Sequence, residues 1–421
     1  MTVEMKKYKL GDLIDVSRGK SLAGEFYATS GNLVRLTMGN FDYINNCFKQ
    51  NTSKDNLFFS GEVEEKFILN AGDIITPLTE QTPGLLGSTA RIPESGKYIQ
   101  SQDVALVRCK KDKLDDGFAY YLISSESVKK QLGAAAQQTK IRHTSPDKIK
   151  DCTVYIPEIS IQRKIGNILS TLDKRIENLR AQNRVLEQTA KTIYDYTFLQ
   201  CAGHQTTYNK TLNRNIPTNW EVCTIGNYIK ENKGGDWGKE NPEKNYNLQV
   251  SCIRGADIDK MTDLPMRYIL AKNSSKLLQE FDLVVEISGG SPTQSTGRSR
   301  LMTKELLEMF DNKLICSNFC QAVTMKNPQY AYYISFMWKM FYDNGIFFNF
   351  EGKTSGIKNF QLDQFVDTMW FFPDLKTVEK FNAQVAPLIK KQLFNAKQIE
   401  ALTTQRNTLL PLLMTGQITI K

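Results

Sequence analysis

Three short motifs combine residue types that could do chemistry, and each lacks a part that its chemistry needs. Gly352-Lys353-Thr354 has the end of a phosphate-binding loop, but that loop requires another glycine at position 347, which is Phe. Asn327-Pro328-Gln329-Tyr330 differs at its third residue from the Asn-Pro-Pro-Tyr motif that holds the amino group of a flipped base. We also find no glycine-rich loop suited to a methyl donor, and we predict a simple turn before a helix.

The third motif has the residue types of a nuclease site. Pro373-Asp374 is followed by Glu379-Lys380, but the Glu-x-Lys spacing of such sites is missing. Two scattered histidines, His143 and His204, provide little for a Ser-His-Asp arrangement. We therefore predict that the chain has no catalytic centre of its own.

The cysteines favour neither a metal site nor a secreted protein. No Cys-x-x-Cys pair occurs among the eight cysteines, and the chain has two histidines, so we expect no structural zinc. Scattered cysteines in a chain this long are typical of reduced, buried thiols and predict a cytoplasmic protein. Residues 1–9 contain no apolar run, and no uncharged apolar stretch approaches ~20 residues. We therefore expect neither a signal peptide nor a membrane span.

The elements that would position a binding site occur twice in the 421 residues. Ala119-Tyr120-Tyr121 recurs as Ala331-Tyr332-Tyr333, and Ile156-Pro157-Glu158 recurs as Phe372-Pro373-Asp374. The intervals are 212 and 216 positions, and such a long period indicates a domain duplication. A duplicated domain predicts two similar surfaces, as a reader of a two-part target needs.

Between the repeats, short strand-like runs alternate with turn-rich loops and a few short helices. We therefore predict mixed α/β domains over residues 1–156 and 201–372. Long helices are predicted over residues 157–200 and 373–421, each with a proline in its first turn. The expected fold is α+β, with two similar mixed α/β domains and two long antiparallel coiled-coil helices in a pseudo-twofold repeat.

Apolar residues recur every seven positions in both long helices, which indicates coiled-coil pairing. Asn395, Gln392 and Arg406 are polar residues at this seam and can fix its register. At ~1.5 Å per residue a 40-residue helix is roughly 60 Å long, against ~34 Å for one turn of B-DNA. The pair could separate two DNA readers, or it could serve only as a dimerisation or packing element. The helix-pairing residues are Ile165, Leu172, Leu179, Leu186, Ile193, Phe381, Leu388, Leu402 and Leu409.

The net charge of +9 suits a nucleic-acid partner, because lysine and arginine neutralise phosphates and release counterions. The same charge also fits a mildly basic protein without such a partner. Hydrophobic residues make up 41% of the chain and charged residues 24%, an ordinary globular composition. Charge alone therefore leaves both interpretations open.

Taken together, these features resemble the specificity subunits of type I restriction–modification systems. The order of domain, long helix, similar domain and long helix covers essentially the whole chain. The motifs that carry the resemblance are Gly72-Asp73-Ile74, the Tyr-Tyr pairs, a Pro-x6-Lys start of each long helix, Lys353 to Lys358 and Leu410 to Ile418.

The resemblance implies a non-catalytic DNA-binding subunit with two target-recognition domains, each reading one half of an asymmetric bipartite site. It implies that the long helices act as a spacer and as docking surfaces for modification subunits, two of them by expectation, which methylate adenine at N6. Restriction subunits would add translocation and cleavage. S-adenosylmethionine, ATP and Mg²⁺ are expected in those partners, and none of them in this chain.

Candidate DNA contacts are polar or basic residues in loops that the two domains share, because phosphate contacts position a protein and base contacts specify sequence. Gln81 and Gln294 could pair with adenine, and Arg35 or Arg254 with guanine. Glycine-rich loops at 84–88 and 289–297 could let backbone approach phosphates. The full set is Arg18, Lys20, Arg35, Thr37, Thr79, Gln81, Thr82, Lys140, Arg142, His143, Lys233, Trp237, Lys239, Arg254, Ser288, Gln294, Arg298, Arg300, Lys353 and Lys358.

Two other function classes compete with this hypothesis. The first is an adenine-N6 methyltransferase or a fused restriction enzyme, which Gln329 and the missing donor loop oppose. The second is a scaffold that binds protein or sugar, which the basic charge weakly opposes.

Overall fold

A computed structural model describes residues 4–80, 84–135, 142–259, 263–289, 293–311, 313–354, 357–418 and 420. The chain divides into two compact units. Unit 1 consists of Met1–Glu177 and Ala401–Lys421, and unit 2 of Asn178–Glu400. No helix within the described ranges is long and apolar enough to cross a membrane.

Unit 1 is built on a four-stranded antiparallel sheet in the order β10-β8-β12-β2. The central strand β12 begins with four buried residues, Val-Ala-Leu-Val, as a short apolar run covered on both faces does. The strands of this sheet are β10 (Ala90–Arg91), β8 (Ile74–Pro77), β12 (Val104–Cys109) and β2 (Ile14–Arg18).

Smaller strand groups surround this sheet. A second sheet has the order β11-β4-β7-β3, in which β11 and β4 run parallel. Its strands are β11 (Tyr98–Ile99), β4 (Val34–Arg35), β7 (Phe58–Phe59) and β3 (Tyr27–Ala28). The two-stranded ribbons are β1 (Lys6–Lys9) with β14 (Thr153–Ile156), β5 (Phe41–Asp42) with β6 (Cys47–Phe48), and β9 (Thr79–Glu80) with β13 (Arg142–His143).

Unit 2 has a four-stranded antiparallel sheet in the order β23-β21-β25-β18. All four residues of the central strand β21 are buried. The strands are β23 (Ser299–Leu301), β21 (Leu283–Glu286), β25 (Cys320–Met325) and β18 (Ile229–Gly234). One three-stranded sheet has the order β20 (Met266–Leu270), β19 (Tyr246–Ile253) and β24 (Leu314–Cys316). A second has the order β22 (Ser288–Gly289), β27 (Ile357–Phe360) and β26 (Glu351–Thr354). The two-stranded ribbons are β17 (Glu221–Thr224) with β28 (Met369–Phe372), and β15 (Thr206–Asn209) with β16 (Arg214–Pro217).

The internal repeat is visible in this topology. β2, β8, β10 and β12 of unit 1 correspond to β18, β21, β23 and β25 of unit 2, and the spatial order is the same. The parallel pair β4–β11 corresponds to β19–β24, which is also parallel. In the ladders, Lys6 lies opposite Ile156 and Glu221 opposite Phe372, so the end of each domain pairs with its beginning.

Short helices complete both units. Unit 1 has α1 (Asp116–Ile123), α2 (Glu126–Ala135) and α3 (Pro146–Lys150). Unit 2 has α5 (Lys304–Glu308), α6 (Ala331–Asp343) and α7 (Leu362–Val366). The Tyr-Tyr pairs of the repeat lie in α1 and α6, and Tyr121 and Tyr333 are both buried.

The two long helices are α4 (Ile159–Tyr194), which continues as a π-helical turn over Asp195–Leu199, and α8 (Leu375–Met414). Both begin two residues after Pro157 and Pro373, so the prediction of proline in the first helical turn is wrong. At α8 the first turn is capped instead by Asp374, whose carboxylate accepts a hydrogen bond from the backbone N–H of Thr377 at 3.1 Å.

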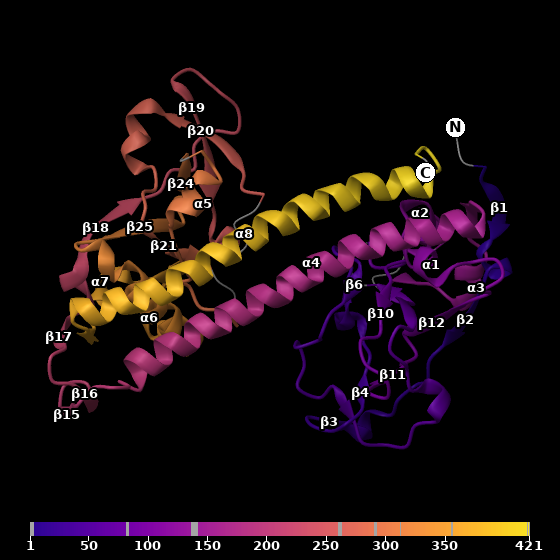
Figure 1. Ribbon diagram of the computed structural model, residues 1–421, viewed down its shortest axis with the longest axis horizontal. Helices are drawn as coiled ribbons and strands as arrows, with labels where there is room; N and C mark the ends of the chain where they lie inside the picture. The colour runs from indigo at the N-terminus through magenta and orange to yellow at the C-terminus, as the bar shows by residue number, and fades with distance from the viewer. Residues whose placement is uncertain are drawn as a thin grey trace. The chain divides into compact units, whose positions relative to one another are not determined.

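Each unit contains part of both long helices, and the two parts lie side by side in opposite directions (Figure 1). In unit 1, Ile165 and Leu169 share a core with Leu413 and Met414, and Asp173 pairs with Arg406. This confirms the predicted fold class, with two mixed sheet regions and two long helices packed together.

In unit 2, Asn183 donates to the backbone carbonyl of Gln392 at 3.2 Å, and Gln392 donates to that of Asn183 at 3.1 Å. Asn395 is fully buried and donates to Asn183 Oδ1 at 2.9 Å. Further along the pair, Tyr194 and Phe381 meet in the core of unit 2. The polar seam residues are therefore hydrogen-bonded inside the helix pair.

The predicted helix-pairing residues fall into two groups. Ile165, Leu179 and Phe381 are buried. Leu169, Ile176 and Val385 are buried as well, and with the predicted residues they alternate spacings of four and three, as the two apolar positions of a heptad seam do. The partly buried members are Leu172, Leu186, Ile193, Leu388, Leu402 and Leu409.

Removal of the Asp173 carboxylate tests the polar seam of unit 1. Asp173 accepts from the Tyr121 hydroxyl at 2.6 Å and from Arg406 Nη1 at 2.8 Å, and Arg406 is only 8% exposed. Because Asp173→Ala leaves a buried guanidinium and a hydroxyl without this acceptor, we expect a loss of about 2 kcal/mol in the free energy of unfolding. Urea unfolding of the full chain measures it. Lys174→Ala, at the exposed next position, is the matched control, and equal losses in both variants would contradict the assignment.

Candidate nucleic-acid interface

The ribbons β9–β13 and β22–β27 occupy equivalent places in the two units. In unit 1, Thr79 lies opposite His143 and Glu80 opposite Arg142. In unit 2, Ser288 lies opposite Asn359 and Gly289 opposite Lys358. Each ribbon joins the segment after a central strand of the main sheet to the segment before a short helix. The fold thus gathers several predicted contact residues at one place in each unit.

A buried carboxylate organises the ribbon of unit 1. Glu80 is 2% exposed and forms an ion pair with Arg142 at 2.9 Å. Its Oε2 accepts hydrogen bonds from the backbone N–H groups of Gly84, Leu85 and Leu86 at 3.1, 3.0 and 2.9 Å. Those N–H groups, which the sequence suggested for phosphate binding, are thus already directed at an anion of the protein itself.

Three predicted cations of unit 2 are likewise paired with buried carboxylates. Lys233 contacts Asp282 at 2.8 Å, and Arg298 contacts Glu286 at 2.9 Å. Lys358 lies 3.0 Å from Glu351. The hydrogen bond to Glu286 raises the pKa of Arg298 above that of a free guanidinium, so the pair stays charged. Loss of any of these cations would leave a carboxylate unpaired in the protein interior.

The two arginines predicted to contact guanine have their donor groups engaged. Arg35 is 8% exposed, donates to the backbone carbonyl of Asn56 at 3.0 Å and lies 3.8 Å over the ring of Tyr27. Arg254 is exposed but donates through two nitrogens to Asp257, at 2.6 and 2.8 Å, which raises its pKa. A two-pronged contact of either residue with a base through Nε and Nη2 would require these bonds to break.

Other predicted contacts remain at the surface. Arg18 ends β2 in an exposed position and forms no ion pair with any residue that the structure describes. His143 and Gln294 are exposed, and Lys239 is exposed 4.0 Å from Glu243. These residues are available to a polyanion without the loss of a buried partner.

The remaining candidates are partly buried or lie outside the description. Lys20 contacts Glu64 at 3.5 Å, and the Thr37 hydroxyl accepts from Asn51 at 2.8 Å. The Trp237 ring lies 3.8 Å below the guanidinium of Arg267. Arg300 lies in β23 opposite Val284. Gln81, Thr82 and Lys140 are outside the described residues, as is the side chain of Lys353, whose backbone is in β26.

The rejected motifs serve the fold. Asn327 Oδ1 accepts from the backbone N–H of Gln329 at 3.0 Å and caps the 3₁₀ turn Pro328–Tyr330, which leads directly into α6. Within the described parts of the chain, no group of three or more His, Cys, Asp or Glu side chains is placed to hold a metal ion. Burial raises the pKa of Cys252, Cys316 and Cys320 to about 12, so these thiols stay protonated at neutral pH.

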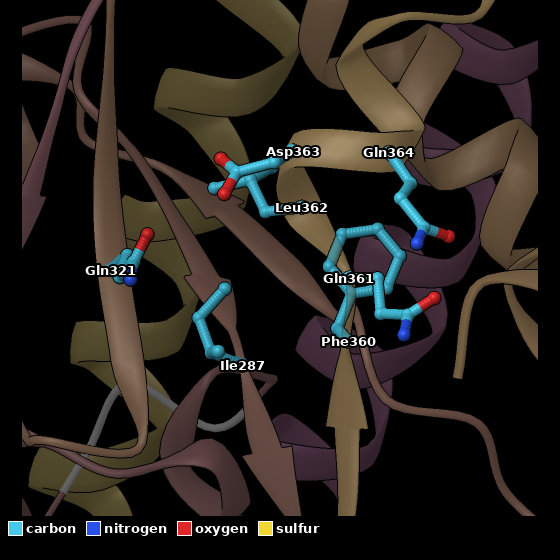
Figure 2. A pocket seen from close by; sticks show the side chains of 7 residues that line it. All are labelled: Ile287, Gln321, Phe360, Gln361, Leu362, Asp363 and Gln364. Carbon is cyan, nitrogen blue, oxygen red and sulfur yellow. The ribbon is translucent and has the colours of Figure 1, made fainter. Parts of the chain in front are cut away.

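A pocket of about 290 Å³ that no sequence pattern indicates lies in unit 2 beside the β22–β27 ribbon (Figure 2). Ile287, Phe360 and Leu362 give it apolar walls, and its polar lining is Gln321, Gln361, Asp363 and Gln364. Gln321 comes from β25, whereas residues 360–364 form the end of β27 and the start of α7. The glutamines belong to no sequence motif. Only the folded chain brings Gln321 close to residues 360–364, so the sequence does not group them.

Comparison with known proteins shows which family the chain resembles. Residues 2–188 match the sequence profile of the "Type I restriction modification DNA specificity domain". The specificity subunit of the type I restriction enzyme MjaIX from Methanocaldococcus jannaschii is 22% identical over 319 residues, which are 74% of this chain and 71% of that protein. A putative type I restriction enzyme MjaX specificity subunit from the same organism is 23% identical over 199 residues, 45% of each chain.

A crystal structure of the S subunit of a type I restriction–modification system from M. genitalium has the same fold. It superposes with a TM-score of 0.63 at 16% sequence identity, over 98% of this chain and 96% of that one. The matching profile, the related sequences and the shared fold agree with the duplicated topology. Residues 2–188 therefore carry the DNA specificity domain of type I restriction–modification systems, and the chain is similar to their specificity subunits in sequence and in fold.

Proposed function

We propose that this chain binds a bipartite, asymmetric DNA site, with each unit reading one half. As a specificity subunit it is a non-catalytic component of a type I restriction–modification complex. The observation that carries the proposal is the duplicated strand order with different side chains at equivalent positions. Two equal scaffolds with unlike contact residues are what recognition of two unlike half-sites requires.

The ribbon positions illustrate this difference. Where unit 1 has the buried Glu80 opposite Arg142, unit 2 has Gly289 opposite Lys358. His143 and Asn359 follow at equivalent positions, and they differ in donors and acceptors. Sequence-specific readout depends on such donor and acceptor patterns, so the halves of the site should differ.

The chemistry of modification and cleavage would lie in partner subunits. We propose that modification subunits, two by expectation, dock on α4 and α8 and methylate adenine at N6, and that restriction subunits join the same assembly. S-adenosylmethionine would then bind the modification subunits, and ATP with Mg²⁺ the restriction subunits. The exposed residues of both long helices offer surface for such contacts.

Methylome sequencing tests the proposal directly. A host that expresses this chain with its modification subunits should carry N6-methyladenine at one motif made of two defined halves and an undefined spacer. The same host without this chain should lack that motif. A motif with a single continuous half, or methylation that persists without the chain, would refute the bipartite reading.

Arg18→Ala tests the phosphate contacts of unit 1. Because Arg18 is exposed and forms no ion pair with the described residues, its loss should weaken DNA binding severalfold and lower the slope of log affinity against log salt by about 1. Fluorescence anisotropy of the assembled modification complex over a KCl series measures both. Lys111→Ala, which removes an exposed charge at the turn after β12, is the control and should change neither. Unchanged affinity and slope in Arg18→Ala would remove Arg18 from the interface.

The spacer role of α4 and α8 predicts the effect of a matched insertion. Seven residues after Arg180, with seven after Lys397, keep the heptad stripe in phase and lengthen each helix by roughly 10 Å, about three base pairs of B-DNA. The methylated motif should gain about three spacer base pairs and retain both halves. The same insertion in α4 alone is the control, since it leaves α8 without matching positions. An altered half-site with an unchanged spacer would contradict a spacer function.

A further inference from the structure

The pocket beside the β22–β27 ribbon has free hydrogen-bonding capacity. The side chains of Gln321, Gln361, Asp363 and Gln364 make no hydrogen bond or ion pair with any other described residue. Gln361 and Gln364 extend their amides on one side of the view in Figure 2, and Gln321 stands on its own strand at the other side. Gln361, Asp363 and Gln364 are exposed and Gln321 is half-buried, so a ligand can pair with them without breaking a hydrogen bond between described residues.

The chemistry of the lining selects the kind of ligand. Three amides offer donors and acceptors, the Asp363 carboxylate offers acceptors, and the described lining residues include no lysine or arginine. This set favours neither a phosphate nor another anion. It matches the edge of a base with an exocyclic amino group, since glutamine pairs with adenine N6 and N7 and a carboxylate accepts from cytosine N4. The apolar walls, Ile287 and Phe360 among them, suit the carbon face of a base or a thymine methyl group.

The equivalent place in unit 1 is used differently. The two places correspond because Thr144 N–H donates to Leu78 and Phe360 N–H donates to Ile287, each just before a short helix. Ser145, at the position of Gln361, accepts from the N–H of Lys148 and caps α3.

The neighbouring positions of unit 1 are also engaged within the fold. Lys148, at the position of Gln364, donates to the carbonyl of Ala135 at 2.8 Å. Asp147, at the position of Asp363, pairs with Lys150 at 2.7 Å. Ala105 takes the position of Gln321 in the central strand. In unit 1, Ser145, Asp147 and Lys148 therefore contact other residues of the fold, whereas in unit 2 the equivalent side chains line the pocket.

Gly352 leaves space beside the amide of Gln361. A Cβ atom at Gly352 would lie 3.0 Å from Gln361 Nε2, which is tighter than an ordinary contact. In contrast to the pocket side chains, Lys358 of the adjoining strand is held by Glu351 and by the carbonyl of Gln294. The amides of the pocket are therefore less engaged within the protein than Lys358 is.

We infer that Gln321, Gln361, Asp363 and Gln364 form a base-reading pocket of unit 2, which recognises adenine or cytosine amino groups in one half-site. The inference rests on the proposed function and assigns recognition of that half to amides and a carboxylate. The half-site read by unit 1 is independent of these residues.

Methylome sequencing of strains carrying Gln361→Ala and Gln364→Ala, each assembled with wild-type modification subunits, tests this inference. Loss of one two-pronged base contact should reduce discrimination about tenfold at one or two positions of one half-site, with the other half and the spacer unchanged. Gln364→Glu keeps the length of the side chain and removes its donors, so preference at the affected position should move from adenine toward cytosine. Gln279→Ala, an exposed glutamine of unit 2 outside the pocket, is the control and should leave the motif unchanged.

The outcomes separate the inference from the proposed function. A bipartite motif that stays identical in all three pocket variants would overturn the pocket assignment and leave the proposed function standing. Absence of any motif with the wild-type chain would overturn the proposed function itself. If an alanine variant gives no methylation, thermal unfolding of the purified assembly decides. An unchanged melting temperature supports lost recognition, and a melting temperature lowered in the Gln364→Glu variant as well would overturn the assignment in favour of a structural role.

Discussion

The structure depends on the burial of the apolar stripes of two long helices. An amphipathic helix cannot leave such a stripe in water, and each unit buries one part of both stripes in its own core. Unit 1 needs Leu413 and Met414 from the far end of the chain to complete the core around Ile165 and Leu169. Each sheet region is thereby joined to a specific stretch of the helix pair, and the domains of the sequence do not coincide with the units of the fold.

The polar residues inside the helix pair carry a second constraint. In unit 2, Asn183 exchanges hydrogen bonds with Gln392 and accepts one from Asn395, and in unit 1 Asp173 pairs with Arg406. A shift of one helix along the other would separate these partners and leave polar groups in an apolar contact. The leucines favour association of the helices in several registers, whereas these polar side chains meet their hydrogen-bond partners in only one register.

The pairing of buried polar groups also decides which residues can contact DNA. Each buried carboxylate in these domains needs a cationic partner. Three such pairs are Glu80 with Arg142, Asp282 with Lys233, and Glu286 with Arg298. These three cations are therefore not available to DNA. What remains are exposed residues such as Arg18 and the unpaired amides beside the β22–β27 ribbon. The two units share one strand order, but they differ in which side chains are paired within the fold and which remain able to contact DNA.

The sequence by itself determined the duplication, the two long helices and the α+β class, because these depend on periodicity along the chain. It also identified Asn395 and Arg406 as seam residues, since polar residues in a heptad stripe are visible by position alone. The tertiary structure decided which candidate contacts are free. Lys233 meets Asp282, and Arg142 meets Glu80, across intervals that no local pattern reveals. It also brought Gln321 of β25 to the segment around Gln361, because these residues are 40 positions apart in the sequence and line one pocket only in the folded chain.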